Sequence, residues 1–241
     1  MSGHSKWNNI KHKKEKSDAA KAKIFTKIGK EMAVAIKAGG PDPAVNSKLR
    51  DLIAKAKANN VPNENIQRTI KKFTDNSDIN YEEITYEGYG PSGVAIIVET
   101  STDNRNRTAG NVRAWFNKYG GNMGQNGCVA YLFEEKGVIT IIDEDEEIDE
   151  DKIMEDALEC GAEDIISDDG EYKIYTSSDE LSDVRDAIIA LGYKIDTADL
   201  AKVPSTYVEL TSQDDIDNME KMLDKFNEDD DVNAVYTNWD N

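Results

Sequence analysis

Histidine and cysteine are scarce in this sequence of 241 residues, which holds two of each. His4 and His12 both lie near the N-terminus, with no acid and nucleophile placed to complete a catalytic triad. Cys128 and Cys160 form neither a CxxC pair nor an even disulfide framework. The sequence therefore excludes a disulfide scaffold and predicts a reducing, cytoplasmic location.

Long apolar runs are also missing. No stretch approaches the roughly 18 uncharged residues that a membrane span needs, and the N-terminus has no apolar signal region. Since 38% of the residues are hydrophobic and 32% charged, the sequence predicts a globular protein without a membrane partner.

Motifs for cofactors, metals and catalysis are absent or fail on inspection. Residues 88–93 fit G-x-G-x-x-G, but Pro91 lies inside and a strand pattern follows, where a dinucleotide site needs a helix. The acidic run 143–152 fails as a calcium loop, because Ile148 replaces the loop glycine and Met154 the bidentate glutamate. No Walker loop, nucleophile elbow or HExxH occurs. We expect no catalytic residue, no metal and no cofactor, and predict that the chain is not an enzyme.

Charge is divided unevenly along the chain. Residues 1–75 hold 17 Lys and Arg against seven Asp and Glu, a net charge of +10, whereas the whole chain carries −19. Such an asymmetry predicts a polyanion-binding module on an acidic body. Lysine dominates the basic part, and lysine contacts phosphate as a point charge more than it reads bases.

Helical periodicity places these lysines. Amphipathic helices are predicted over about 17–38, from residue 42 to about 58, and from residue 63 onward, with Val45 expected among the inward residues of the second. The first helix has an apolar stripe and an opposite lysine row. The predicted nucleic-acid contacts of this region and of the basic arm before it are Lys6, Trp7, Lys11, His12, Lys13, Lys14, Lys16, Lys23, Lys27, Lys30, Arg68, Lys71 and Lys72. Trp7 could stack on a base or pack against the helices.

The remainder alternates strand and helix patterns, so the predicted fold class is α+β. Residues 134–204 read as βαββαβ, a ferredoxin-like order. Residues 205–241 are expected to complete a sheet begun near Tyr81. The predicted domains are thus 1–77 (basic, helical), 78–133 plus 205–241 (discontinuous), and 134–204 (acidic).

The segment STDNRNRTAG joins a strand to a helix. Arg105 and Arg107 at this helix start could contact an anion or RNA, or could pair with nearby carboxylates. Both interpretations remain open from the sequence.

Three segments, MSGHSKWNNIKHKK, AGGPDPAVNSKLRDLIAKAKANNVPNENIQRTIKK and YEEITYEGYGPSGVAIIVETSTDNRNRTAGNVRAWFNKYGGNMGQNGCVAYLFEEKG, closely resemble the YebC/PmpR family. The resemblance implies a helical N-terminal domain followed by two α/β domains around a cleft. It also implies a cytoplasmic DNA-binding transcriptional regulator, although some members are described as acting in translation on the ribosome.

Together these observations predict a non-enzymatic nucleic-acid-binding regulator of gene expression that grips the phosphate backbone. We favour a ribosome-associated translation factor bound to ribosomal RNA, with a regulator of transcription bound to double-stranded DNA as the alternative. A third hypothesis is an enzyme or a purely protein-binding adaptor built on the acidic cleft. The adaptor is compatible with either of the first two, since an acidic face could dock basic ribosomal proteins.

Overall fold

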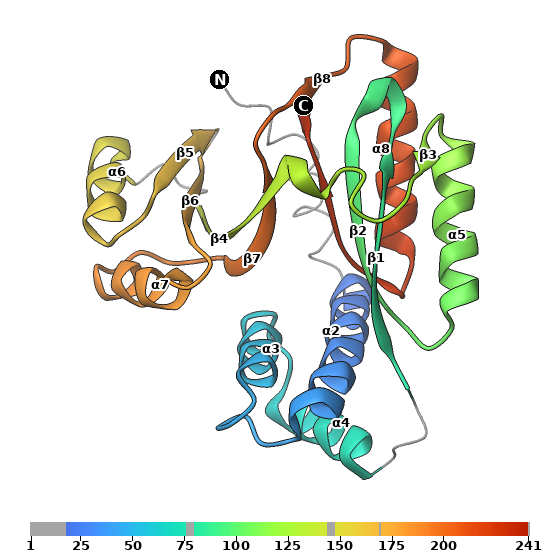
Figure 1. Ribbon diagram of the computed structural model, residues 1–241. Helices are drawn as coiled ribbons and strands as arrows, with labels where there is room; N and C mark the ends of the chain where they lie inside the picture. Colours follow the sequence, from blue (N-terminus) through green and yellow to red (C-terminus); the bar gives the residue numbers. More distant parts are fainter. Residues whose placement is uncertain (1–17, 76–79, 144–147, 169, 241) are drawn as a thin grey trace. The chain divides into compact units, whose positions relative to one another are not determined.

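The structure is a computed structural model that describes residues 18–75, 80–143, 148–168 and 170–240 (Figure 1). It divides into two compact units. The inserted unit is Phe133–Ser205, and the main unit combines the described parts of residues 6–132 and 206–241. Within the described ranges, no helix is long and apolar enough to cross a membrane.

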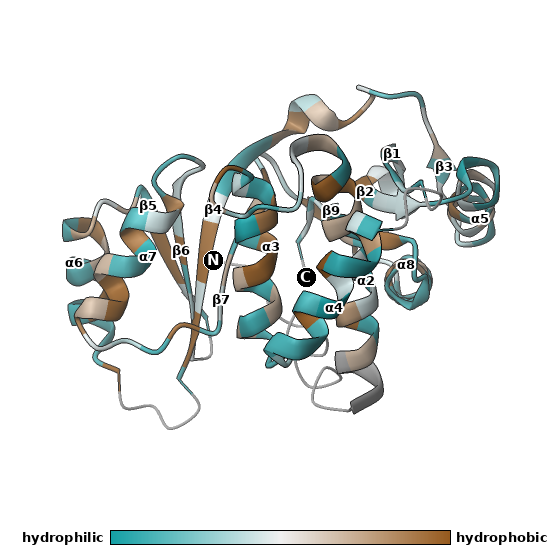
Figure 2. Ribbon diagram, turned by 90° about the horizontal axis from the view of Figure 1, so that it is seen from below, coloured by the Kyte–Doolittle hydropathy of each residue, from teal (hydrophilic) through white to brown (hydrophobic). Residues whose placement is uncertain are grey.

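Three helices begin the main unit: α2 (Asp18–Gly39), α3 (Ser47–Ala58) and α4 (Asn63–Asp75). Each carries apolar and polar sides, visible as brown and teal residues in Figure 2. The apolar sides meet in one core that contains Ile28, Met32, Leu49, Leu52 and Ile66. The apolar stripes predicted for α2 and α4 are therefore confirmed, and that of α3 is confirmed apart from Val45. Amphipathic helices gain most of their stability from such packing.

The start of α3 differs from the prediction. The helix begins at Ser47, and Val45 is 79% exposed instead of buried. The side chain of Asn46 accepts a hydrogen bond from the Leu49 amide (3.1 Å) and donates one to the carbonyl oxygen of Ala35 on α2 (2.8 Å). Asn46 is thus the N-cap of α3, and the residues before it form a turn.

A four-stranded antiparallel sheet completes the main unit in the order β3-β1-β2-β9. Its strands are β1 (Glu82–Tyr89), β2 (Ala95–Thr102), β3 (Asn122–Met123) and β9 (Val232–Thr237). The 3₁₀ turn η1 (Pro91–Gly93) joins β1 to β2, which confirms that the G-x-G-x-x-G stretch is a strand-to-strand turn. The short strands β8 (Val208–Glu209) and β10 (Trp239–Asp240) form a separate parallel pair.

Helices α5 (Arg105–Lys118) and α8 (Gln213–Glu228) cover one face of this sheet (Figure 1). Every second residue of β2 points into the core they enclose, as Ile96 and Val98 do, against Phe116 and Phe226. The aromatic rings of Phe116 and Phe226 lie 5.3 Å apart. Because β9 and α8 come from the C-terminal segment, the sheet begun at β1 is completed only after the inserted unit.

The inserted unit contains β4 (Phe133–Ile142), α6 (Glu150–Glu159), β5 (Asp164–Asp168), β6 (Glu171–Ser177), α7 (Leu181–Ala190) and β7 (Thr197–Pro204). The strands lie in the order β5-β6-β4-β7, and all neighbours are antiparallel. This order is that of a ferredoxin-like unit, so the predicted topology and the α+β class are confirmed. Its core contains Ile139, Ile141, Ile153, Ile174 and Ile188. The proposed division of the main unit at residue 77 stays a prediction.

Candidate nucleic-acid interface

The predicted contacts divide by position. Seven of them lie outside the described residues: Lys6, Trp7, Lys11, His12, Lys13, Lys14 and Lys16. The others lie on α2, on α4 and at the start of α5.

The basic residues of α4 face solvent. Arg68, Lys71 and Lys72 are exposed, whereas Ile66 on the same helix is 1% exposed. The helix therefore packs one side into the bundle and presents cations on the other, an arrangement that can contact phosphate without displacing any core residue.

The lysine row of α2 is arranged differently from the prediction. Three of its lysines donate from Nζ to backbone carbonyl oxygens at the C-terminal end of α8 and in the turn that follows it. The pairs are Lys23 with Glu228, Lys27 with Asn227 (3.0 Å) and Lys30 with Asp230 (2.8 Å). The Lys30 side chain is only 13% exposed. The row was expected to face solvent, but a segment about 200 residues away in sequence covers it.

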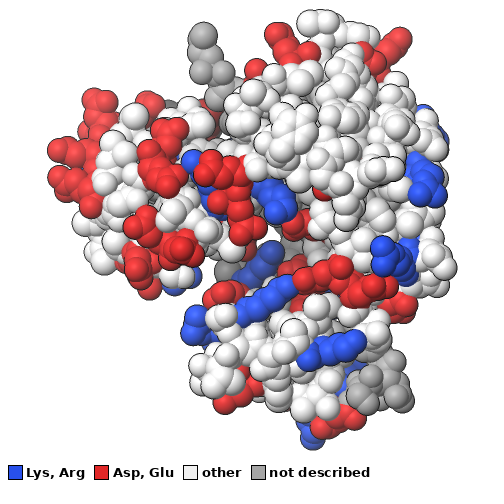
Figure 3. Space-filling model, viewed as in Figure 1, with Lys and Arg blue, Asp and Glu red and all other residues white. Residues whose placement is uncertain are grey.

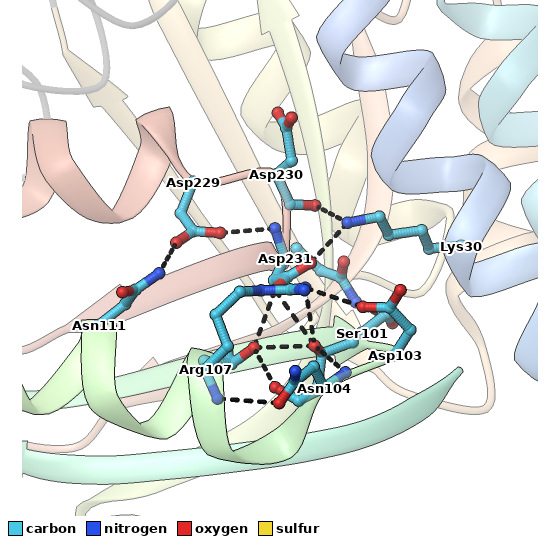
Figure 4. A network of polar contacts seen from close by, with 12 residues as sticks. Lys30, Ser101, Asp103, Asn104, Arg107, Asn111, Asp229, Asp230 and Asp231 are labelled. Carbon is cyan, nitrogen blue, oxygen red and sulfur yellow. Dashed lines mark hydrogen bonds and ion pairs between the residues drawn. The ribbon is translucent and has the colours of Figure 1, made fainter. Parts of the chain in front are cut away.

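Asp231 is the centre of this contact (Figure 4). It is 4% exposed, and its carboxylate accepts hydrogen bonds from Lys30 Nζ (2.7 Å) and Arg107 Nη2 (2.6 Å). The hydroxyls of Thr102 (3.1 Å) and Thr108 (2.8 Å) lie within hydrogen-bond distance of the same group. One buried carboxylate thus joins α2, the end of β2 and the start of α5.

The electrostatics agree with this geometry. Burial would raise the pKa of the Asp231 carboxyl, but the hydrogen bonds from Lys30, Arg107 and Thr108 outweigh it and lower that pKa to about 2. The hydrogen bonds to Asp231, and second to Asp103, raise the pKa of the Arg107 guanidinium. The Asp231 carboxylate and the Arg107 guanidinium are therefore both ionised at neutral pH.

Of the two arginines in the DNRNR turn, Arg107 matches the carboxylate-pairing interpretation. It pairs with Asp231 and also with Asp103 (2.8 Å). The backbone amide of Arg107 donates to the side chain of Asn104, the N-cap of α5 (3.1 Å), so one of the amides that could hold an anion is already satisfied. Arg105 is exposed, and its contact with an anion stays a prediction.

A surface hollow of about 420 Å³ lies beside the network. Its lining consists of Lys30, Arg107, Glu228, Asp229, Asp230 and Asp231. The lining has four acidic residues and two cations, and both cations are already paired with carboxylates. Its net negative charge does not favour a phosphate group. Nor do any three His, Cys, Asp or Glu side chains in the described ranges group as metal ligands would.

Acidic side chains concentrate on the inserted unit, where red atoms dominate Figure 3. Residues 133–205 hold six Lys and Arg against 24 Asp and Glu, a net charge of −18. This unit alone therefore carries nearly all of the net charge of the chain, and it repels polyanions.

The comparisons with known proteins agree over the whole chain. Residues 5–76 match the family model "TACO1/YebC protein N-terminal domain", and residues 81–239 match "TACO1/YebC second and third domain". The chain belongs to the TACO1/YebC family. The resemblance inferred from the sequence motifs is thereby confirmed.

Relatives in this family carry regulatory names. The chain is 54% identical over 240 residues to a probable transcriptional regulatory protein of Acetivibrio thermocellus, covering 99% of each. It is also 54% identical over 241 residues to a protein of the same name from Agathobacter rectalis, covering 100% of each. A crystal structure of a conserved hypothetical protein from Aquifex aeolicus superimposes with a TM-score of 0.83 at 41% identity, covering 92% of this chain and 91% of that one. The relatives from Acetivibrio thermocellus and Agathobacter rectalis are named as regulatory proteins, not as enzymes.

Two carboxylates of this TACO1/YebC protein are buried although the sequence did not predict it. Asp231 stands in an acidic run that reads as solvated, and Glu87 stands in an alternating strand. Glu87 is 5% exposed and accepts backbone hydrogen bonds from Gly127 (2.7 Å), Val129 (2.9 Å) and Ala130 (2.8 Å). The alternation of β1 places Glu87 on the face opposite α5 and α8, but it does not reveal that a loop covers that face.

Proposed function

We propose that this protein is a cytoplasmic, non-enzymatic regulator of gene expression that binds the phosphate backbone of nucleic acid through its basic N-terminal region. The observation that carries the proposal is the outward set Arg68, Lys71 and Lys72 on α4, opposite the bundle core. In sequence, further lysines of residues 1–17 precede the bundle. Lysine-rich surfaces bind polyanions by releasing counterions, whatever the net charge elsewhere in the chain.

Among nucleic acids, we favour ribosomal RNA, so that the protein acts as a ribosome-associated translation factor. The accessible cations are mainly lysines, which suit backbone and shape more than base reading. The acidic inserted unit could then dock basic ribosomal proteins through complementary charge.

A DNA-binding transcriptional regulator is the second candidate. Gln67 is exposed next to Arg68 on α4, and both side-chain types can read base edges in a major groove. The printed names of the relatives also favour this function.

Competition between intact ribosomes and mixed-sequence duplex DNA, titrated with salt, tests the proposal. The double variant Lys71→Glu/Lys72→Glu is expected to bind either target more weakly and to reduce the log–log salt slope by about 2. The matched control is Lys194→Glu/Lys221→Glu, an equal charge change at exposed lysines on other elements. The thermal midpoint should stay unchanged in both.

Preferential binding to ribosomes supports the translation factor, and equal or stronger binding to DNA supports the transcriptional regulator. If the α4 variant and its control bind alike, and reversal of Lys11 and Lys13 also has no effect, then the basic region is not the contact surface.

A further inference from the structure

The face of the main sheet opposite α5 and α8 is covered by a loop, residues 124–132, which ends in the 3₁₀ turn η2 (Ala130–Leu132). The loop is held by the buried Glu87 carboxylate, which accepts three of its backbone N–H groups. Burying a carboxylate costs several kcal/mol unless such donors replace water. The loop is therefore fixed in position on the sheet.

Glycine makes this close attachment possible. A Cβ on Gly124 would lie 2.5 Å from Cys128 Sγ, and one on Gly121 would lie 2.6 Å from the carbonyl oxygen of Tyr89. Gly127 has φ +86°, a conformation that L side chains rarely adopt. Three glycines thus allow the close approach of this segment to the sheet.

The fixed loop presents an aromatic side chain to solvent. Tyr131 is 73% exposed, although it sits in the same turn as the buried, anchored Val129. Tyr89, two residues after Glu87 on the same face of β1, is 36% exposed and donates from its hydroxyl to the carbonyl oxygen of Cys128 (3.0 Å). A hydrogen bond with Tyr131 is the main cause that raises the pKa of Tyr89, so the two phenol groups lie together.

The exposed segment around this pair has no charged side chain of its own, and the Glu87 carboxylate that holds it is buried. Residues 119–133 contain no charged side chain in a chain that is 32% charged, and Gln125 and Asn126 are exposed beside the anchored segment. In Figure 3 a broad area of the main unit shows neither red nor blue. A segment with no exposed carboxylate repels a nucleic-acid strand little, while aromatic faces and amide groups suit the flat, hydrogen-bonding bases.

We propose that Tyr131, supported by Tyr89, is a stacking site for an unpaired nucleobase, with Gln125 and Asn126 able to hydrogen-bond its edge. The inference rests on the proposed nucleic-acid function and adds a base contact to the phosphate contacts of α4. A rigid aromatic loses little conformational entropy on stacking, which is why anchoring by Glu87 matters for the site.

Binding of the full chain to a 12-nucleotide oligoadenylate, compared with an abasic oligomer of equal length and charge, tests this site. The wild-type protein should prefer the oligoadenylate by about 5- to 150-fold, the range that stacking of one base supplies. Tyr131→Ala should lose most of that preference, and Tyr131→Phe should keep it, because the ring remains. Binding of the abasic oligomer should be the same for all three proteins.

Tyr207→Ala is the matched control, since Tyr207 is another partly exposed tyrosine of the main unit, at 42%. It should retain the full preference. An exposed Tyr131 predicts an unchanged thermal midpoint for the alanine variant, which separates loss of stacking from loss of folding.

Several results overturn the site: no preference in the wild type, an unchanged preference in Tyr131→Ala, or an equal loss in Tyr207→Ala. If Tyr131→Ala weakens ribosome binding but not oligoadenylate binding, the surface contacts a protein instead of a base. Loss of abasic binding in the α4 variant, with no effect of Tyr131→Ala, keeps the proposed function and rejects the stacking site.

Discussion

At the residue scale, Asp231 is the group whose environment differs most from what its sequence suggests, which is a solvated carboxylate. It is the third of three consecutive aspartates, yet Asp230 beside it has a side chain that is 64% exposed while Asp231 is buried. Its partners, Lys30 and Arg107, come from two other elements. A buried carboxylate paired in this way stabilises the native state only while it is ionised.

We expect Asp231→Asn to lower the free energy of unfolding by about 2–4 kcal/mol at neutral pH, because two cations lose their buried partner. The pKa of Asp231 is about 2 in the folded protein, below its ordinary value of 3.8. Its stabilisation is therefore complete above about pH 5 and is lost as the pH falls toward 2. Urea denaturation from pH 7 to pH 2 should show the difference between wild type and variant shrinking by on the order of 2 kcal/mol.

Asp230→Asn is the control for that experiment. It makes the same charge change but keeps the backbone carbonyl that Lys30 contacts, so it should change stability by less than about 0.5 kcal/mol. A difference between wild type and Asp231→Asn that does not vary with pH would contradict the ionic role.

Sequence reasoning found most of the fold because its signals are local. The βαββαβ order and the apolar stripes of α2 and α4 depend on spacing within one element. The partners of Lys30 cannot be found from spacing within one element. A helical wheel shows which side of α2 faces away from the bundle core, but it does not show that residues 227–231 lie against that side. Val45 was misplaced because the helix was expected to begin at residue 42, whereas Asn46 caps α3.

At the element scale, the loop of residues 124–132 depends on one strand residue for its position. We expect Glu87→Gln to free this loop, because an amide offers one acceptor oxygen and adds a buried donor where the carboxylate accepted three N–H groups. Amide hydrogen exchange at Gly127, Val129 and Ala130 should accelerate by about tenfold or more, as for the loss of about 1.4 kcal/mol of local stability.

The exchange of amides in the α6–β5 region of the inserted unit provides an internal reference for this variant. It should remain as in the wild type, since Glu87 belongs to a different compact unit. Slow exchange preserved at all three loop amides would show that other contacts fix the loop.

At the scale of the whole molecule, charge is segregated between the two units. The inserted unit carries −18, a charge that disfavours the approach of polyanions to the protein at low salt. Neutralising three exposed acids of α6 (Asp151→Asn, Glu155→Gln and Glu159→Gln) should raise nucleic-acid affinity a few-fold at about 20 mM salt.

The gain should disappear near 0.3 M salt, because screening shortens the reach of the field to a few ångströms. Filter binding at the two salt concentrations measures this. An affinity that stays unchanged at low salt would show that the inserted unit exerts no electrostatic influence on the interface.

The interruption of the main sheet also sets an order of assembly during synthesis. Strands β1 and β2 leave the ribosome early, but their partner β9 and the carboxylate of Asp231 emerge only after all of residues 133–205. The inserted unit is continuous in sequence, and domains can fold as they are synthesised. It can therefore finish folding before β1 and β2 have their partner strand β9. A chain that stops within residues 133–205 would therefore expose the β2 edge and leave the α2 lysines uncovered, which marks it as incomplete to proteases and chaperones.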